Sequence, residues 1–282
     1  MRFHLPTAET FVPDGLPLEQ ALARTTHMAV SAHQDDIEIM AAAPIVTCFQ
    51  QPDRWFTGVV VTDGRGSPRA DIYANYSDEE MRLVRFKEQK KAAVVGEFAA
   101  QILLDYPSRM VKDGAESKPV DDLAALFLAA RPAHVYTHNL ADKHDTHVAV
   151  ALKTIAALRR LPAEARPQKV YGCEVWRDLD WLVDADKVPL DLSGHENLQA
   201  ALLGVFDSQI AGGKRYDLAS MGRRKANATY FESHSVDAST GLSWAMDLTP
   251  LITQPDKDVA AYVDEVIQHL AQDVAGRLKR VG

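Results

Sequence analysis

The chain has 282 residues, of which 46% are hydrophobic and 25% are charged, and this composition predicts a folded globular protein rather than a disordered one. Its net charge of −8 argues against nucleic acid as the main partner, because affinity for nucleic acid depends on neutralising phosphates with Lys and Arg.

The number of cysteines and the length of the apolar runs indicate the cellular compartment of the protein. The two cysteines, Cys48 and Cys173, are too few for the usual disulfide framework of a secreted protein, and neither belongs to a CxxC pair. Residues 1–26 lack the apolar run of a secretory signal, and no stretch approaches the roughly 18 apolar residues of a membrane helix. We therefore expect a cytoplasmic protein without a membrane partner.

From Thr26 onward, short apolar runs alternate with longer segments of helical periodicity, which is typical of an α/β protein with a mostly parallel sheet. The apolar runs predict strands over 27–31, 56–62, 101–106, 134–137 and 169–175, with weaker candidates at 188–192 and 242–248. The periodic segments predict helices over 36–49, 78–97, 120–130, 144–160, 196–209, 218–230 and 256–279. The polar stretch 209–215 indicates a surface loop.

Two clusters of metal-binding residue types follow predicted strands. His33, Asp35 and Asp36 come directly after the first strand, and His144 and His147 come shortly after the fourth. In an open parallel sheet, ligands bind at the carboxyl ends of strands near the point where strand order reverses, so these clusters are expected to meet. Imidazole and carboxylate are normal zinc ligands, and a catalytic zinc keeps three protein ligands and one open position.

This arrangement suits hydrolysis of an amide by an activated water. His33 and Asp36 supply two candidate ligands, and one of the two later histidines supplies the third while the other serves the reaction. Asp35 is the candidate general base, since its neighbour would be neutralised by the metal. The remaining histidine would stabilise the oxyanion that forms on the carbonyl.

The two clusters resemble the motifs of a known enzyme family. His33-Gln34-Asp35-Asp36 resembles the A-H-P-D-D motif of the PIG-L/LmbE-like deacetylases, and His144-Asp145-Thr146-His147 resembles their H-P-D-H motif. Weaker similarity surrounds these motifs, over roughly residues 28 to 235.

The resemblance implies a Rossmann-like, three-layer α/β/α fold and one zinc ion held by His33, Asp36 and His147. It gives the role of base to Asp35 and the charge-stabilising role to His144. It also places Asp63 and Arg85, with less specific motifs, near the substrate pocket. Members of the family remove acetyl groups from N-acetylglucosamine attached to another group, so the implied partner is a small glycoconjugate.

The domain organisation follows from the same resemblance. Residues 1–282 are expected to form a single domain of this type, with a core over about 26–176 and a part, 177–282, that completes the sheet and pocket. A divalent metal other than zinc and a homo-oligomeric state are both compatible with the sequence.

Two departures from the family motifs matter. Gln34 stands where the family has proline, which affects the stiffness of the loop more than its chemistry. Asp145-Thr146 stands where the family has Pro-Asp, so a threonine occupies the usual aspartate position. A carboxylate contact to one of the histidines would then have to come from Asp145 or Asp142.

Three other functions remain open at this point. The same groups could cleave another amide, such as a cysteinyl amide of a glycoside. Phosphoester hydrolysis would ordinarily require two metals about 3.5–4 Å apart and more ligands than the clusters supply. A sugar-binding protein without activity is the third alternative, since a fold does not fix function, although this chain retains the ligands and the base.

Overall fold

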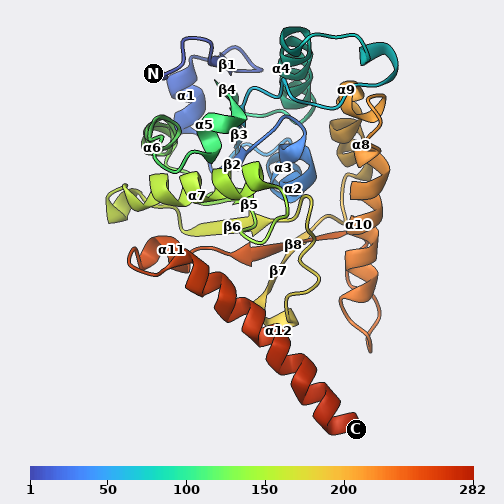
Figure 1. Ribbon diagram of the computed structural model, residues 1–282. Coiled ribbons are helices and arrows are strands. Elements are labelled where there is room, and N and C mark those ends of the chain that lie inside the picture. Colours follow the sequence, from blue (N-terminus) through green and yellow to red (C-terminus); the bar gives the residue numbers. More distant parts are fainter.

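An eight-stranded sheet runs through the computed structural model, which describes residues 1–282 (Figure 1). The strand order is β1-β4-β3-β2-β5-β6-β8-β7, and four of the seven neighbouring pairs are parallel. The strands are β1 (Glu9–Phe11), β2 (His27–Ser31), β3 (Phe56–Thr62), β4 (Ala100–Tyr106), β5 (His134–His138), β6 (Lys169–Cys173), β7 (Lys187–Asp191) and β8 (Leu242–Asp247). The predicted α/β fold with a mostly parallel sheet is confirmed.

Helices cover both faces of the sheet. On one face lie α1 (Leu18–Ala23), α5 (Ser108–Lys112), α6 (Lys118–Ala130), α7 (Asp145–Arg159) and α11 (Pro250–Thr253). On the other face lie α2 (Asp36–Met40), α3 (Ala42–Cys48), α4 (Asp78–Val95) and α8 (Glu196–Gly204). The chain continues through α9 (Asp207–Ile210) and α10 (Tyr216–Tyr230), and it ends with α12 (Val259–Val281). This arrangement is the expected three-layer α/β/α architecture.

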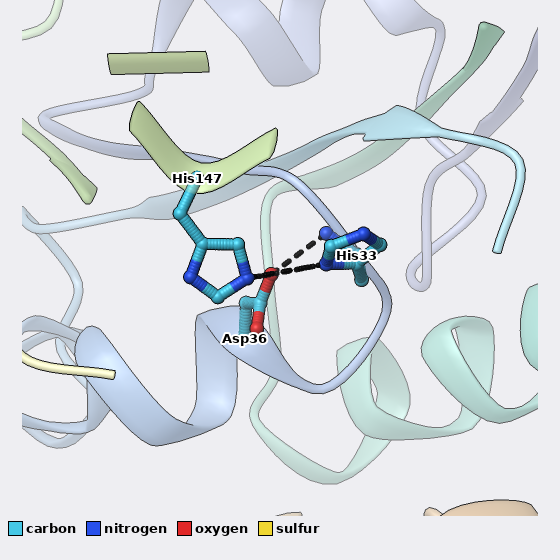
Figure 2. Close-up of side chains that lie close together, drawn as sticks. All are labelled: His33, Asp36 and His147. Atoms are coloured by element: carbon cyan, nitrogen blue, oxygen red, sulfur yellow. Dashed lines mark hydrogen bonds and ion pairs between the residues drawn. The ribbon is translucent and has the colours of Figure 1, made fainter. Parts of the chain in front are cut away.

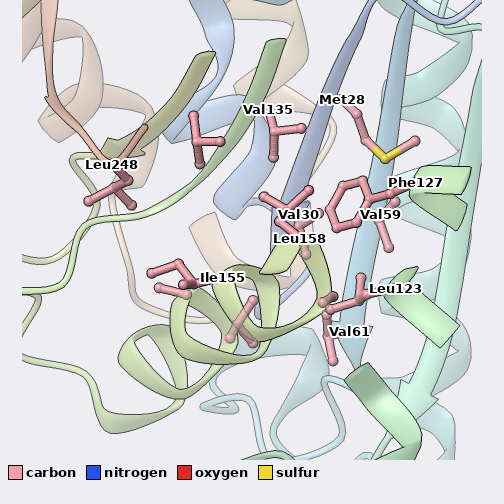
Figure 3. Close-up of a cluster of buried hydrophobic side chains, with 14 of the residues drawn as sticks. Met28, Val30, Val59, Val61, Leu123, Phe127, Val135, Ile155, Leu158 and Leu248 are labelled. Carbon is pink, nitrogen blue, oxygen red and sulfur yellow. The ribbon is translucent and has the colours of Figure 1, made fainter. Parts of the chain in front are cut away.

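The central strands are apolar at successive positions because both of their faces are covered. In β2 and β3 every residue is buried. Met28 and Val30 point into the larger core beneath α6 and α7, whereas Ala29 points into the core beneath α2, α3 and α4. Figure 3 shows the larger core, where Leu123 and Phe127 of α6 and Ile155 and Leu158 of α7 pack against these strands. The period of two along each strand thus builds both cores at once.

The order of the strands determines where a site can form. The chain passes from β2 outward to β3 and β4, and it then crosses to the other side of β2 to form β5 and β6. The loops that follow β2 and β5 therefore leave the same edge of the sheet in diverging directions. Such a reversal opens a crevice at the carboxyl ends of the strands.

Several predicted elements differ from the observed ones. The helix predicted over 36–49 is divided at Ala41 into α2 and α3, which places Pro44 in the first turn of α3, where the missing N–H is tolerated. The helix predicted over 196–209 is likewise divided, because α8 ends at Gly204 and α9 begins at Asp207. The short elements β1, α1 and α5 were not predicted.

The last helix stands apart from the body of the protein. Figure 1 shows α12 running away from the sheet towards the C-terminus. Val266 is its only buried residue, and Leu278 near its end is 66% exposed. No helix has the length and apolar character required to cross a membrane.

Candidate metal and catalytic site

The two predicted clusters meet at the reversal in strand order. His33 and Asp35 lie in the loop after β2, Asp36 begins α2, and His147 lies in the first turn of α7 after β5. Figure 2 shows the side chains of His33, Asp36 and His147 pointing towards one another from these separate elements. The fold therefore brings together residues that are more than a hundred positions apart in the sequence.

The three side chains present atoms that one metal ion could share. His33 Nδ1 is 3.2 Å from Asp36 Oδ2 and 3.2 Å from His147 Nε2, and His147 Nε2 is 3.4 Å from Asp36 Oδ2. Ligands about 2.0–2.1 Å from a tetrahedral zinc ion are about 3.3–3.4 Å apart, so this triangle has the size that one ion requires. Two imidazoles and one carboxylate are also a donor set that fits zinc.

Asp142 supports the triangle from behind. Its Oδ2 lies 3.5 Å from His147 Nδ1, and its two oxygens accept hydrogen bonds from the backbone N–H groups of His144 and Trp176. With Nδ1 facing a carboxylate, the lone pair of His147 Nε2 is directed at the other two ligands. The carboxylate contact anticipated from Asp145 or Asp142 thus comes from Asp142, and it reaches His147 rather than His144.

His138 lies beside the triangle but is occupied by the backbone. Its ring stacks on His147 with centroids 3.9 Å apart, and its Nε2 accepts a 2.8 Å hydrogen bond from the N–H of Ala32. An acceptor nitrogen must be unprotonated, and burial lowers the pKa of His138 well below its usual value. His138, Asp142 and His147 form a second cluster of close donor atoms, but the Ala32 hydrogen bond makes it the poorer cation site.

Asp35 is buried next to the triangle in an unusual backbone conformation. Its φ is +92°, and its backbone N–H donates to Gln89 Oε1 at 3.2 Å. Burial raises the pKa of Asp35 to about 7, against the opposing effect of the Arg85 guanidinium 3.5 Å away. Arg85 also donates to the carbonyl of Gln34, so it ties down the loop that carries the base. A strained backbone at such a position is typical of a functional site.

His144 stacks on His147 with ring centroids 4.5 Å apart. Its Nδ1 is buried without a hydrogen-bond partner, and Thr146 occupies the position where the family motif has aspartate. Burial lowers the pKa of His144, and the neighbouring imidazoles of His147 and His33 lower it further. The ring is therefore neutral at neutral pH and can still donate one N–H hydrogen bond.

A cavity of about 460 Å³ opens over these groups, which is a volume suited to a small ligand. Its lining residues come from both halves of the chain: His33, Asp35, Asp36, Gly64, Gly66, Ser67, Pro68, Arg85, Ser108, Lys112, His144, Thr146, Trp176, Gln209, Lys214 and Tyr216. Of the two residues predicted to contact substrate, Arg85 lines this cavity. Asp63 lies in the adjoining hollow instead, where it is paired with Arg65 at 2.7 Å.

Sequence reasoning missed part of this cavity. Lys112, Lys214 and Tyr216 line it, but they lie outside any motif and far apart in the chain. Gln209 was expected in a surface loop and is instead buried. Trp176 faces the cavity, whereas Trp244 is buried in the larger core. Only the packing of the whole chain brings these residues to the site.

Comparison with known proteins gives one family match. Residues 28–158 match the family described as "PIG-L: GlcNAc-PI de-N-acetylase". That segment runs from β2 through α7, so it contains all three residues of the triangle, together with Asp35 and His144. No match is found among curated proteins.

Solved structures with similar folds share little sequence with this chain. A 4-carboxy-2-hydroxymuconate hydratase from Pseudomonas putida KT2440 gives a TM-score of 0.59 at 14% identity, covering 79% of this chain and 95% of the hydratase. An N,N'-diacetylchitobiose deacetylase from Pyrococcus horikoshii gives a TM-score of 0.57 at 15% identity, covering 79% of this chain and 84% of that deacetylase. The A40926 pseudoaglycone deacetylase gives a TM-score of 0.58 at 15% identity, covering 79% of this chain and 97% of that deacetylase. These similarities establish the fold.

Proposed function

We propose that this chain, whose residues 28–158 match the PIG-L family, is a metal-dependent hydrolase. It would remove an acyl group, most simply acetyl, from the nitrogen of an amino sugar in a small glycoconjugate. The observation that carries the proposal is the triangle of His33, Asp36 and His147, whose donor atoms are 3.2–3.4 Å apart beside the buried carboxyl of Asp35. These three side chains could together hold one metal ion, with Asp35 as the candidate base beside it.

The triangle would hold one zinc ion per chain through His33 Nδ1, one oxygen of Asp36 and His147 Nε2. Bound there, the ion supplies Lewis acidity, which polarises the amide carbonyl and makes a water acidic enough to react near neutral pH. Asp142 would keep the His147 ring in the tautomer that leaves Nε2 free. Another divalent ion with a preference for nitrogen and oxygen ligands would suit the same donors.

The other residues of the site transfer the protons, stabilise the charge that develops on the carbonyl oxygen and position the base. Asp35 accepts the proton of the attacking water and passes it to the nitrogen that leaves, and its burial, which raises its pKa, favours the uptake of that proton. His144 donates an N–H hydrogen bond to the oxygen of the carbonyl as negative charge develops on it. Arg85 holds Asp35 and its loop in place.

The fold alone does not identify the substrate, since a hydratase and two deacetylases share this fold. Cleavage of another amide, such as a cysteinyl amide of a glycoside, would use the same groups with a different occupant of the outer cavity.

The direct test is the release of acetate from a panel of N-acetylglucosaminides by the zinc-loaded protein, with Asp35→Asn as the inactive control. Acetate release that is lost in the control supports the proposal. No release from any member of the panel, by protein that carries stoichiometric zinc, would overturn it. Two metal ions per chain with phosphatase activity would favour phosphoester hydrolysis instead.

A further inference from the structure

The charged residues of the cavity fall into two groups. At the inner end, which holds the candidate metal site, Asp35 and Asp36 lie among the imidazoles, and Arg85 is paired with Asp35. The other charged residues of the lining are two lysines, Lys112 and Lys214. No carboxylate other than those of Asp35 and Asp36 lines the cavity.

Neither lysine has a partner within the chain, in contrast to other cations nearby. Arg65 and Arg69 on the neighbouring loop are paired with Asp63 and Asp78. Neither Lys112, at the end of α5, nor Lys214, before α10, has a carboxylate within 4.0 Å. Two free ammonium groups in one cavity are unexpected in a chain whose net charge is −8, and a concave site concentrates their field.

Aromatic rings connect one of these cations to the reacting groups. The Nζ of Lys214 lies 5.1 Å from the centre of the Trp176 ring, which is the geometry of a cation–π contact. The same ring lies nearly parallel to that of His144, with centroids 6.4 Å apart. Tyr216 meets Trp176 edge-on at 6.1 Å. A ligand that reaches the inner end can therefore also contact Lys214 and the rings beside it.

From this distribution of charge we propose that the natural substrate carries a negatively charged group, a carboxylate or a phosphate, on the part that projects away from the reacting amide, and that Lys112 and Lys214 bind it. The inference rests on the proposed function for the position of the amide, and it adds the charge of the group attached to the amino sugar. Lys112 and Lys214 set specificity, and the groups at the inner end carry out the reaction.

The experiment compares two substrates that differ in this charge, N-acetylglucosamine 1-phosphate and methyl N-acetylglucosaminide, each with zinc-loaded protein. We expect kcat/KM to favour the phosphate by about tenfold or more, because a close charge pair in a concave site is worth at least that factor. In the double variant Lys112→Glu/Lys214→Glu, the loss for the phosphate should exceed the loss for the methyl glycoside by about tenfold or more, mainly through KM.

A matched control is Lys279→Glu, which makes the same charge change on exposed α12, away from the cavity. It should leave the preference for the phosphate intact, which separates local contacts from net charge. The preference should also shrink as salt is raised. Equal kcat/KM for the two substrates, or an equal loss for both in the double variant, would overturn the inference.

Failure of the proposed function gives a different result. In that case neither substrate releases acetate, and the charge inference is decided by calorimetric binding of glucosamine 1-phosphate to the zinc-loaded protein. Binding that weakens by about tenfold in the double variant but not in Lys279→Glu would uphold the inference. Absent binding, or equal binding by all three proteins, would overturn it.

Discussion

Residues 28–158 and residues 177–282 bury their side chains to very different extents. In the first region, β2, β3 and β4 are buried at every position. In the second, β7 has no fully buried residue and α12 has only Val266. The first region supplies the candidate ligands and base from rigid strand ends, and the second supplies Gln209, Lys214 and Tyr216 at the cavity. The candidate reacting groups thus all belong to the first region, whereas the two lysines that we propose to bind the substrate come one from each region.

The largest effect should come from the base in the first region. Asp35→Asn keeps the shape of the side chain but removes the proton acceptor, so kcat should fall by about 10²- to 10⁴-fold with zinc content unchanged. Asp145→Asn, an exposed change nearby on α7, should stay close to wild type. Rates from acetate release, with zinc measured on the same samples, decide the matter. A variant at position 35 within a few-fold of wild type would remove Asp35 from the mechanism.

The next effect should come from the oxyanion donor. His144→Ala removes one hydrogen bond to the developing charge, so kcat should fall by about 10²- to 10³-fold while the metal stays bound. Loss of zinc from this variant would instead make His144 a ligand. Measuring kcat beside zinc content distinguishes the two roles.

A smaller effect should follow at Asp142, which contacts no substrate. Asp142→Asn loses the negative charge that faces His147 Nδ1, so zinc affinity should weaken by about 10- to 100-fold. Competition with a chromogenic chelator measures this affinity. At saturating zinc the rate should recover most of its wild-type value. Unchanged affinity would contradict the orienting role.

The last prediction compares the effect of the same substitution, Leu→Ala, on the free energy of unfolding in each of the two regions. Leu158→Ala in α7 empties a fully buried position in the larger core and should lower the free energy of unfolding by about 2–5 kcal/mol. Leu278→Ala in α12 changes a side chain that is 66% exposed, and it should change that free energy by about 0.5 kcal/mol or less. Denaturant unfolding measures both. Similar losses would mean that α12 is packed in solution against something that the isolated chain does not show.

The same contrast explains how far the sequence predicts the structure. Strands β2 and β3 were predicted with the observed limits, because short runs that are mainly apolar without alternation are typical of strands whose two faces are both covered. The breaks at Ala41 and between Gly204 and Asp207 were missed, because local periodicity continues across them. The three-residue β1 carries too little pattern to be recognised, and only its pairing with β4 forms it.

Some residues of the candidate site could also be predicted from the sequence, and others could not. His33, Asp36 and His147 were grouped in advance because strand ends and motif order both indicate one edge of the sheet, and the structure brings them together. The contact of Asp142 with His147 was left open between two aspartates, and side-chain packing decides it. Lys112 and Lys214 gave no signal, since nothing local in the sequence links two lysines that meet only across a cavity.

The account depends most directly on a single metal ion at the triangle. Zinc per chain, measured by elemental analysis after loading and removal of excess metal, tests it in the wild type, His147→Ala and Asp36→Asn, with circular dichroism to establish that each is folded. We predict one ion in the wild type and a loss of it in both folded variants. One ion retained by either variant, or none in the loaded wild type, would contradict the account.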